Sequence, residues 1–72
     1  MIITLVSRTN VDARQKHYAI EIILEDERIL VRKSEIMFGI SVPLDETYVL
    51  NLTDAISLKT LWMLQIYGIS LN

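Results

Sequence analysis

The sequence predicts an α+β fold, a small antiparallel sheet of four or five strands with one C-terminal helix packed on one face. Three observations lead to this class. Only residues 51–71 are long and periodic enough for a helix, residues 17–33 have the pattern of a β-hairpin, and 72 residues without a linker suit a single domain, 1–72. A small five-stranded barrel with a terminal helix is the alternative.

The N-terminal stretch Ile2–Val6 is short and mostly apolar, which is typical of a shielded strand. The polar stretch Ser7–Lys16 that follows contains several turn formers. We expect it to be a loop.

The stretch from His17 to Lys33 predicts a hairpin whose loop is Asp26-Glu27. The pairs that this loop sets opposite one another are Glu25–Arg28, Leu24–Ile29, Ile23–Leu30, Ile22–Val31 and Glu21–Arg32. Because side chains alternate between faces, both charge pairs share one face with Ile23–Leu30. A half-exposed hairpin results, although a longer loop with a shifted register is open because Asp-Glu lacks glycine.

Two more strands are expected before the helix. In the stretch 34–42, Phe38, Ile40 and Val42 alternate with Met37, Gly39 and Ser41, which predicts a buried face. Gly39 suggests a bulge or a close backbone approach. Pro43 is expected to end this strand, and Thr47–Leu50 is the last strand candidate.

The helix is expected to run from about Asp54 to Tyr67, with Thr53 as its cap and Gly68 at its exit. At helical spacing, one stripe should cover the sheet: Ala55, Leu58, Leu61, Trp62, Gln65 and Ile66. Ile56, Met63 and Tyr67 form a second apolar stripe on the opposite side. Such a stripe is buried either within the chain or against a second chain.

Composition favours association. Hydrophobic residues make up 51% of the chain and mean hydropathy is +0.36, which is apolar for so small a domain. With no cysteine there is neither a disulfide nor a thiolate zinc site to stabilise it, so we expect a homo-oligomer, with a dimer favoured, or an obligate complex. A compact monomer with a few exposed aliphatic residues is the alternative. No run is long enough to span a bilayer or form a signal peptide, so we expect a cytoplasmic protein without membrane partners.

Catalytic and cofactor motifs are missing, which predicts a protein that is not an enzyme. His17 is the single histidine and has no nucleophile beside it in the sequence. Two isolated glycines form no phosphate loop, and the acidic clusters 25–27 and 45–46 lack the ligand spacing of a calcium site. We therefore expect no cofactor and no metal.

A protein-interaction module is the function that these features favour, such as a phage or bacterial regulator or inhibitor that binds a larger protein and self-associates through its helix. The expected interface comprises Ile56, Met63, Tyr67, Ile23 and Leu30, apolar residues rimmed by charge. Nucleic-acid binding is the alternative. Its basic rim would draw on the 8–16 loop and the 28–33 strand, through Arg8, Arg14, Lys16 and Lys33, although the pI of about 5.2 argues against it.

Overall fold

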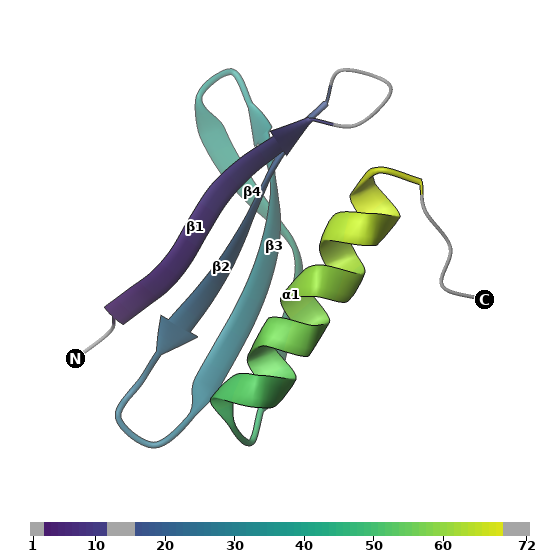
Figure 1. The fold of residues 1–72 in the computed structure, drawn as a ribbon. Coiled ribbons are helices and arrows are strands. Elements are labelled where there is room, and N and C mark those ends of the chain that lie inside the picture. Colours follow the sequence, from purple (N-terminus) through teal and green to yellow (C-terminus); the bar gives the residue numbers. More distant parts are fainter. Residues whose placement is uncertain (1–2, 12–15, 69–72) are drawn as a thin grey trace.

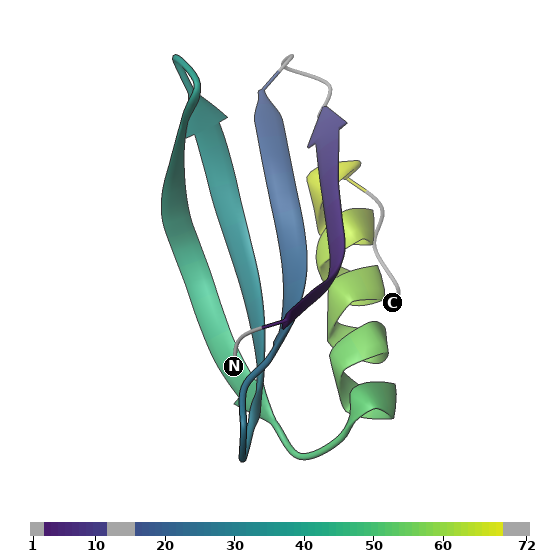
Figure 2. The same cartoon turned by 90° about the vertical axis from the view of Figure 1, so that its left-hand side faces the viewer.

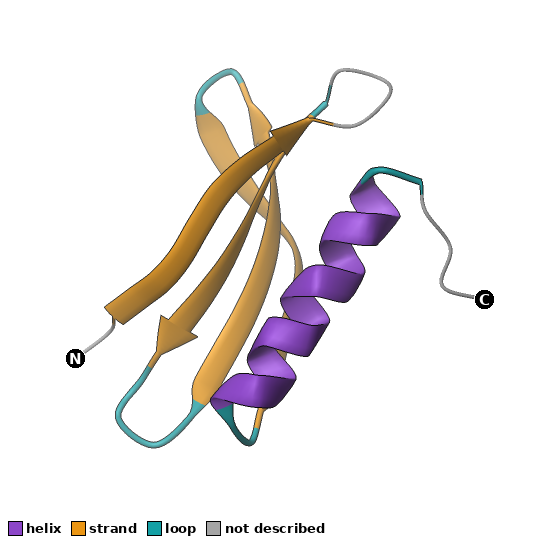
Figure 3. Ribbon diagram, viewed as in Figure 1, coloured by secondary structure: helices purple, strands orange, loops and turns teal. Residues whose placement is uncertain are grey.

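The computed structural model describes residues 3–11 and 16–68 and shows an α+β fold, as predicted. Its elements are β1 (Ile3–Val11), β2 (His17–Leu24), β3 (Ile29–Met37), β4 (Ile40–Val49) and α1 (Leu52–Ile66). The strands form one antiparallel sheet in the order β1-β2-β3-β4, with α1 on one side (Figures 1 and 3). This sheet is open, so the barrel alternative is wrong.

The predicted β2–β3 hairpin is confirmed in register. Leu24 faces Ile29, Ile23 faces Leu30 and Glu21 faces Arg32. The Asp26-Glu27 loop is closed by the Glu25 N–H, which donates to the Arg28 carbonyl at 2.9 Å.

Of the two predicted charge pairs, one forms and one does not. Arg28 Nε lies 2.6 Å from Glu25 Oε2, as expected. Arg32, however, directs its Nε to Glu46 on β4 at 3.0 Å. Since β3 is an inner strand with neighbours on both sides, the register alone does not decide which carboxylate Arg32 takes.

The prediction of a loop over Ser7–Lys16 is wrong for its first half. β1 continues to Val11, and Ser7 and Val11 lie opposite Glu21 and His17 of β2. The polar stretch lacks the apolar alternation that marks a strand. Its extended backbone follows from the pairing with β2, which is a tertiary contact.

The prediction of one strand over residues 34–42 that ends at Pro43 is also wrong. The chain turns at Phe38-Gly39, and β4 then runs through Pro43 to Val49. Proline is tolerated because β4 is an edge strand, where a missing N–H can face away from the ladder. Leu44 is the extra residue of a bulge, because Lys33 pairs with Asp45 while Ser34 pairs with Pro43.

Helix α1 begins two residues earlier than predicted, and Asn51 rather than Thr53 caps it. Asn51 has an extended backbone, and its Oδ1 accepts a hydrogen bond from the Asp54 N–H at 2.9 Å. The exit prediction is correct, because Gly68 has a φ of 74°. A Cβ at this position would be strained by that backbone conformation.

The core lies between α1 and one face of the two inner strands. Ile20, Ile22 and Val31 pack against Ala55 and Trp62 of the helix. Leu58 and Ile66 join them as predicted, whereas Gln65 of the predicted stripe is exposed. Met63 also packs against this core, so the helix face is rotated toward the predicted second stripe.

The cap assignment predicts that Asn51→Ala lowers the free energy of unfolding by about 1 kcal/mol, because the Asp54 N–H loses its acceptor. Thr53→Ala is the matched control and should change the free energy of unfolding by only a few tenths of the loss in Asn51→Ala. Urea denaturation followed by circular dichroism measures both. Equal losses in the two variants would contradict the assignment.

Candidate protein-interaction surfaces

The turn between β3 and β4 carries the most exposed aromatic side chain among the described residues. Phe38 is fully exposed and has a φ of 52°, and Gly39 follows with a φ of 76°. Positive φ at both residues is what a two-residue type I′ hairpin requires, and asparagine or glycine normally supplies it at the first position. Phenylalanine there strains the backbone without any compensating burial.

Exposed apolar side chains surround Phe38, and together they form the hairpin tip: Met37, Phe38 and Ile40. The apolar surface continues along β4 with Val42 and Leu44, which are also exposed. The prediction that Phe38, Ile40 and Val42 form a buried face is therefore wrong. Phe38 lies in a turn rather than a strand, and α1 covers the inner strands instead of β4.

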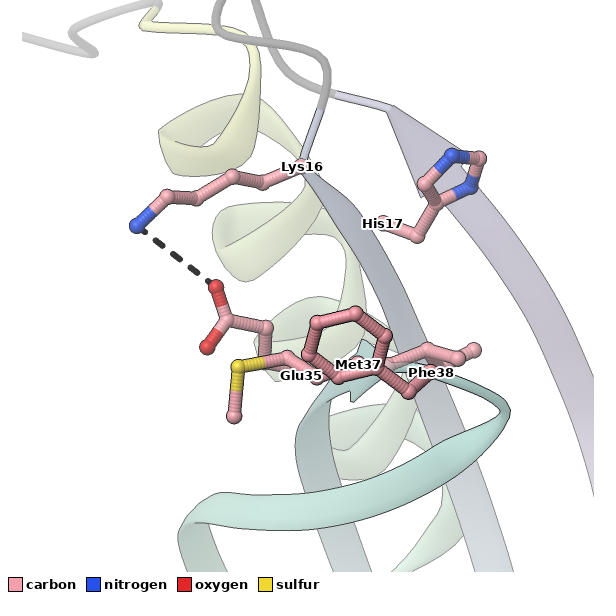
Figure 4. Close-up of a pocket in the computed structure, with 6 residues that line it drawn as sticks. Lys16, His17, Glu35, Met37 and Phe38 are labelled. Carbon is pink, nitrogen blue, oxygen red and sulfur yellow. Dashed lines mark ion pairs between the residues drawn. The ribbon is translucent and has the colours of Figure 1, made fainter.

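A surface pocket of about 350 Å³ lies beside the tip (Figure 4). Its lining combines Phe38 and Met37 with a polar side, where Lys16 Nζ lies 3.6 Å from Glu35 Oε1. His17 also lines it, but its imidazole points away from the Lys16–Glu35 pair in Figure 4. The pocket therefore has an apolar side with a charged rim, and no acid–base pair involving His17 among the described residues.

The helix contributes a smaller apolar surface than the sequence predicts. Ile56 and Tyr67 are 49% and 50% exposed, and Leu52, one turn before Ile56 at the start of α1, is also exposed. Met63, the third predicted interface residue on the helix, is half-buried against the core. The structure thus leaves Ile56 and Tyr67 about half-exposed, whereas Met63 packs against the core.

Ile23 and Leu30, the predicted interface residues of the sheet, lie on the face opposite α1 but have only 4% and 3% of their surface exposed. Both belong to inner strands and have cross-strand neighbours on either side. On the same face, the Arg28 guanidinium carbon lies 4.2 Å from the centre of the Tyr48 ring. Glu25 accepts a hydrogen bond from Arg28, which raises the pKa of its guanidinium.

Of the four cations of the predicted nucleic-acid rim, the structure describes the side-chain contacts of Lys16 and Lys33. Arg8 lies within β1 opposite Ile20, and Arg14 lies outside the described residues. Lys16 pairs with Glu35, while Lys33 lies 5.6 Å from the centre of the Trp62 ring. These contacts engage the two described lysines within the molecule.

The chain matches no protein-family model, no curated protein and no solved structure. Within residues 3–11 and 16–68 there is no group of three His, Asp or Glu side chains that would hold a metal ion. Nor does the described chain contain a helix long and apolar enough to cross a membrane.

The strained turn predicts that Phe38→Asn raises the free energy of unfolding by about 1 kcal/mol, because asparagine tolerates positive φ. Phe38→Ala removes the ring but keeps a β-carbon, so it should give a much smaller gain. Denaturant unfolding of the two variants beside the wild type separates backbone strain from loss of the ring. A destabilised Phe38→Asn variant would show that the ring packs within the monomer.

Proposed function

We propose that this chain is a non-enzymatic protein-interaction module that regulates or inhibits a larger protein, and that it binds this protein through the hairpin tip. The observation that supports the proposal is Phe38, which is fully exposed in a backbone conformation unfavourable for phenylalanine. A residue that costs stability and gains no burial in the free chain suits a role in a complex.

The tip has the composition of a binding anchor. A buried aromatic ring removes about 150–250 Å² from water, and rings with few rotatable bonds lose little entropy on binding. Met37 and Ile40 flank the ring, and methionine adapts to irregular apolar surfaces. The Lys16–Glu35 pair beside them supplies a polar rim, so an apolar pocket or groove with a polar margin is the complementary surface.

Nucleic-acid binding stays the alternative, and no contact among the described residues favours it. The chain carries a net charge of −2, and the described lysines of the rim face Glu35 and Trp62. A phosphate backbone would need these cations to give up their present neighbours. Association through the helix stays an untested alternative, and Ile56 and Tyr67, each about half-exposed, are the residues that it would use.

The tip predicts that Phe38→Asp abolishes capture of the partner. Tagged wild-type and variant proteins are incubated with lysate of the source cell, treated with nuclease and compared by quantitative mass spectrometry. We expect a partner retained by wild type to be lost by Phe38→Asp, with binding weakened at least about 30-fold, because an aromatic anchor contributes about 2 kcal/mol or more.

Tyr67→Asp is the control, because it places the same charge at a different aromatic residue, which is half-exposed and lies at the end of α1. It should leave capture unchanged, and both variants should show wild-type circular dichroism. Retention by Phe38→Asp with loss in Tyr67→Asp would move the binding surface to the helix. Loss of all bound protein after nuclease treatment of the wild type would favour the nucleic-acid alternative.

A further inference from the structure

The outer edge of β4 has no neighbouring strand among the described residues. β4 is the last strand of the sheet, and Figure 2 shows it at the far left with no described element beyond it. Residues 40–48 are exposed, and only Val49 is half-buried. An edge strand of this length presents a row of free backbone N–H and C=O groups to another strand.

The ladder geometry identifies which groups face outward. Glu25 and Arg28 form a hydrogen-bonded pair, and hydrogen-bonded and non-hydrogen-bonded pairs alternate along an antiparallel ladder. The backbone N–H and C=O groups of Leu30 and Arg32 therefore point toward β2, and those of Ile29 and Val31 point toward β4. The β4 partners of Ile29 and Val31 are Val49 and Thr47. The backbone groups of Glu46 and Tyr48 therefore face the free edge.

Pro43 divides this edge into two parts. It lacks an N–H, and the bulge at Leu44 breaks the regular spacing beside it. Residues 45–49 have an unbroken register with β3 and contain neither proline nor glycine. Strand addition is thus confined to residues 45–49, which we call the pairing segment.

We propose that two copies of this chain pair their pairing segments antiparallel about a twofold axis at Thr47, which joins the two sheets into one. In this register Glu46 of each copy exchanges backbone hydrogen bonds with Tyr48 of the other, and Thr47 faces Thr47. Shifting the axis to Glu46 would place two glutamates directly opposite each other, which is destabilising. Shifting it to Tyr48 would leave Asp45 without a partner inside the segment.

Side-chain charges fit the same register. Glu46 already contacts Arg32 of its own chain at 3.0 Å, and Arg28 lies over the Tyr48 ring at 4.2 Å. Because residues directly opposite share a face, Glu46 of one copy lies beside Tyr48 and Arg28 of the second copy. Each Glu46 then lies between Arg32 of its own chain and Arg28 of the second copy, and the twofold axis produces this arrangement twice.

The consequence for binding rests on the proposed function of the tip. Phe38 lies nine residues from Thr47 along the strand, or about 30 Å at roughly 3.3 Å per residue. The twofold axis therefore places the two tips at opposite ends of the joined sheet. A dimer of this form is bivalent and would engage two copies of a partner at once.

Cysteine trapping tests the register directly, because the chain has no cysteine of its own. Thr47 faces Thr47 as a non-hydrogen-bonded pair, with Cα atoms about 4.5 Å apart, within the range of a disulfide. Thr47→Cys should give a reducible dimer under mild oxidation. Ser41→Cys, equally exposed on the other side of Pro43, should cross-link at least about tenfold more slowly.

Light scattering at high protein concentration measures the dimer without a cross-link. Wild type should approach twice 8.3 kDa, and Glu46→Pro, which removes an outward N–H, should return the mass to that of one chain. Ser41→Pro and the double variant Ile56→Asp, Tyr67→Asp should remain dimeric. Phe38→Asp should also remain dimeric while losing the partner, which separates this inference from the proposed function.

Three results would overturn the inference. A wild-type mass of one chain, together with equal cross-linking rates for the Thr47→Cys and Ser41→Cys variants, would exclude pairing at this edge. A dimer that survives Glu46→Pro and is lost in the helix double variant would assign association to α1. Masses that grow past two chains with concentration would indicate head-to-tail pairing of β4 with β1, which does not close.

Discussion

The structure depends on one constraint, which is that a single helix covers the sheet. An α-helix is about 10–12 Å across, whereas a sheet of four strands, each about 4.8 Å wide, is roughly 19 Å across. Trp62 and Ala55 therefore bury Ile20, Ile22 and Val31 of the inner strands, and β4 receives little cover. The exposed apolar surface of this protein follows from that difference in width.

The uncovered strand differs along its length. Toward the turn it presents Ile40 and Val42, which are apolar and exposed, and the turn itself adds Phe38, which is exposed and has a strained backbone. Beyond Pro43 and the bulge it presents a regular edge with paired charges on one face. The first half has the character of an anchor for another protein, and the second half has the character of a strand-pairing edge. Pro43 keeps the two apart, because pairing cannot run through a residue without an N–H.

Ion pairs contribute little to the stability of this fold. Arg28, Arg32 and Lys16 each meet a carboxylate of the same chain, and Lys33 lies over Trp62. Exposed pairs of this kind contribute little to stability, but within the described chain they occupy cations that could otherwise attract a polyanion. The two proposed contacts, apolar at the tip and made by backbone hydrogen bonds at the edge, do not draw on these paired cations.

Local sequence signals determined the α+β class, the β2–β3 hairpin with its register and the glycine exit of α1. Each rests on residues close in the chain: Asp26-Glu27 between alternating strands, a 3.6-residue period, and glycine where φ must be positive. Tertiary structure decided the rest. Pairing with β2 extends β1 into a polar stretch, and the edge position of β4 lets it pass Pro43. The width of one helix leaves Phe38, Ile40 and Val42 exposed although their alternation is that of a buried strand, because periodicity tells which residues share a face and not whether another element covers it.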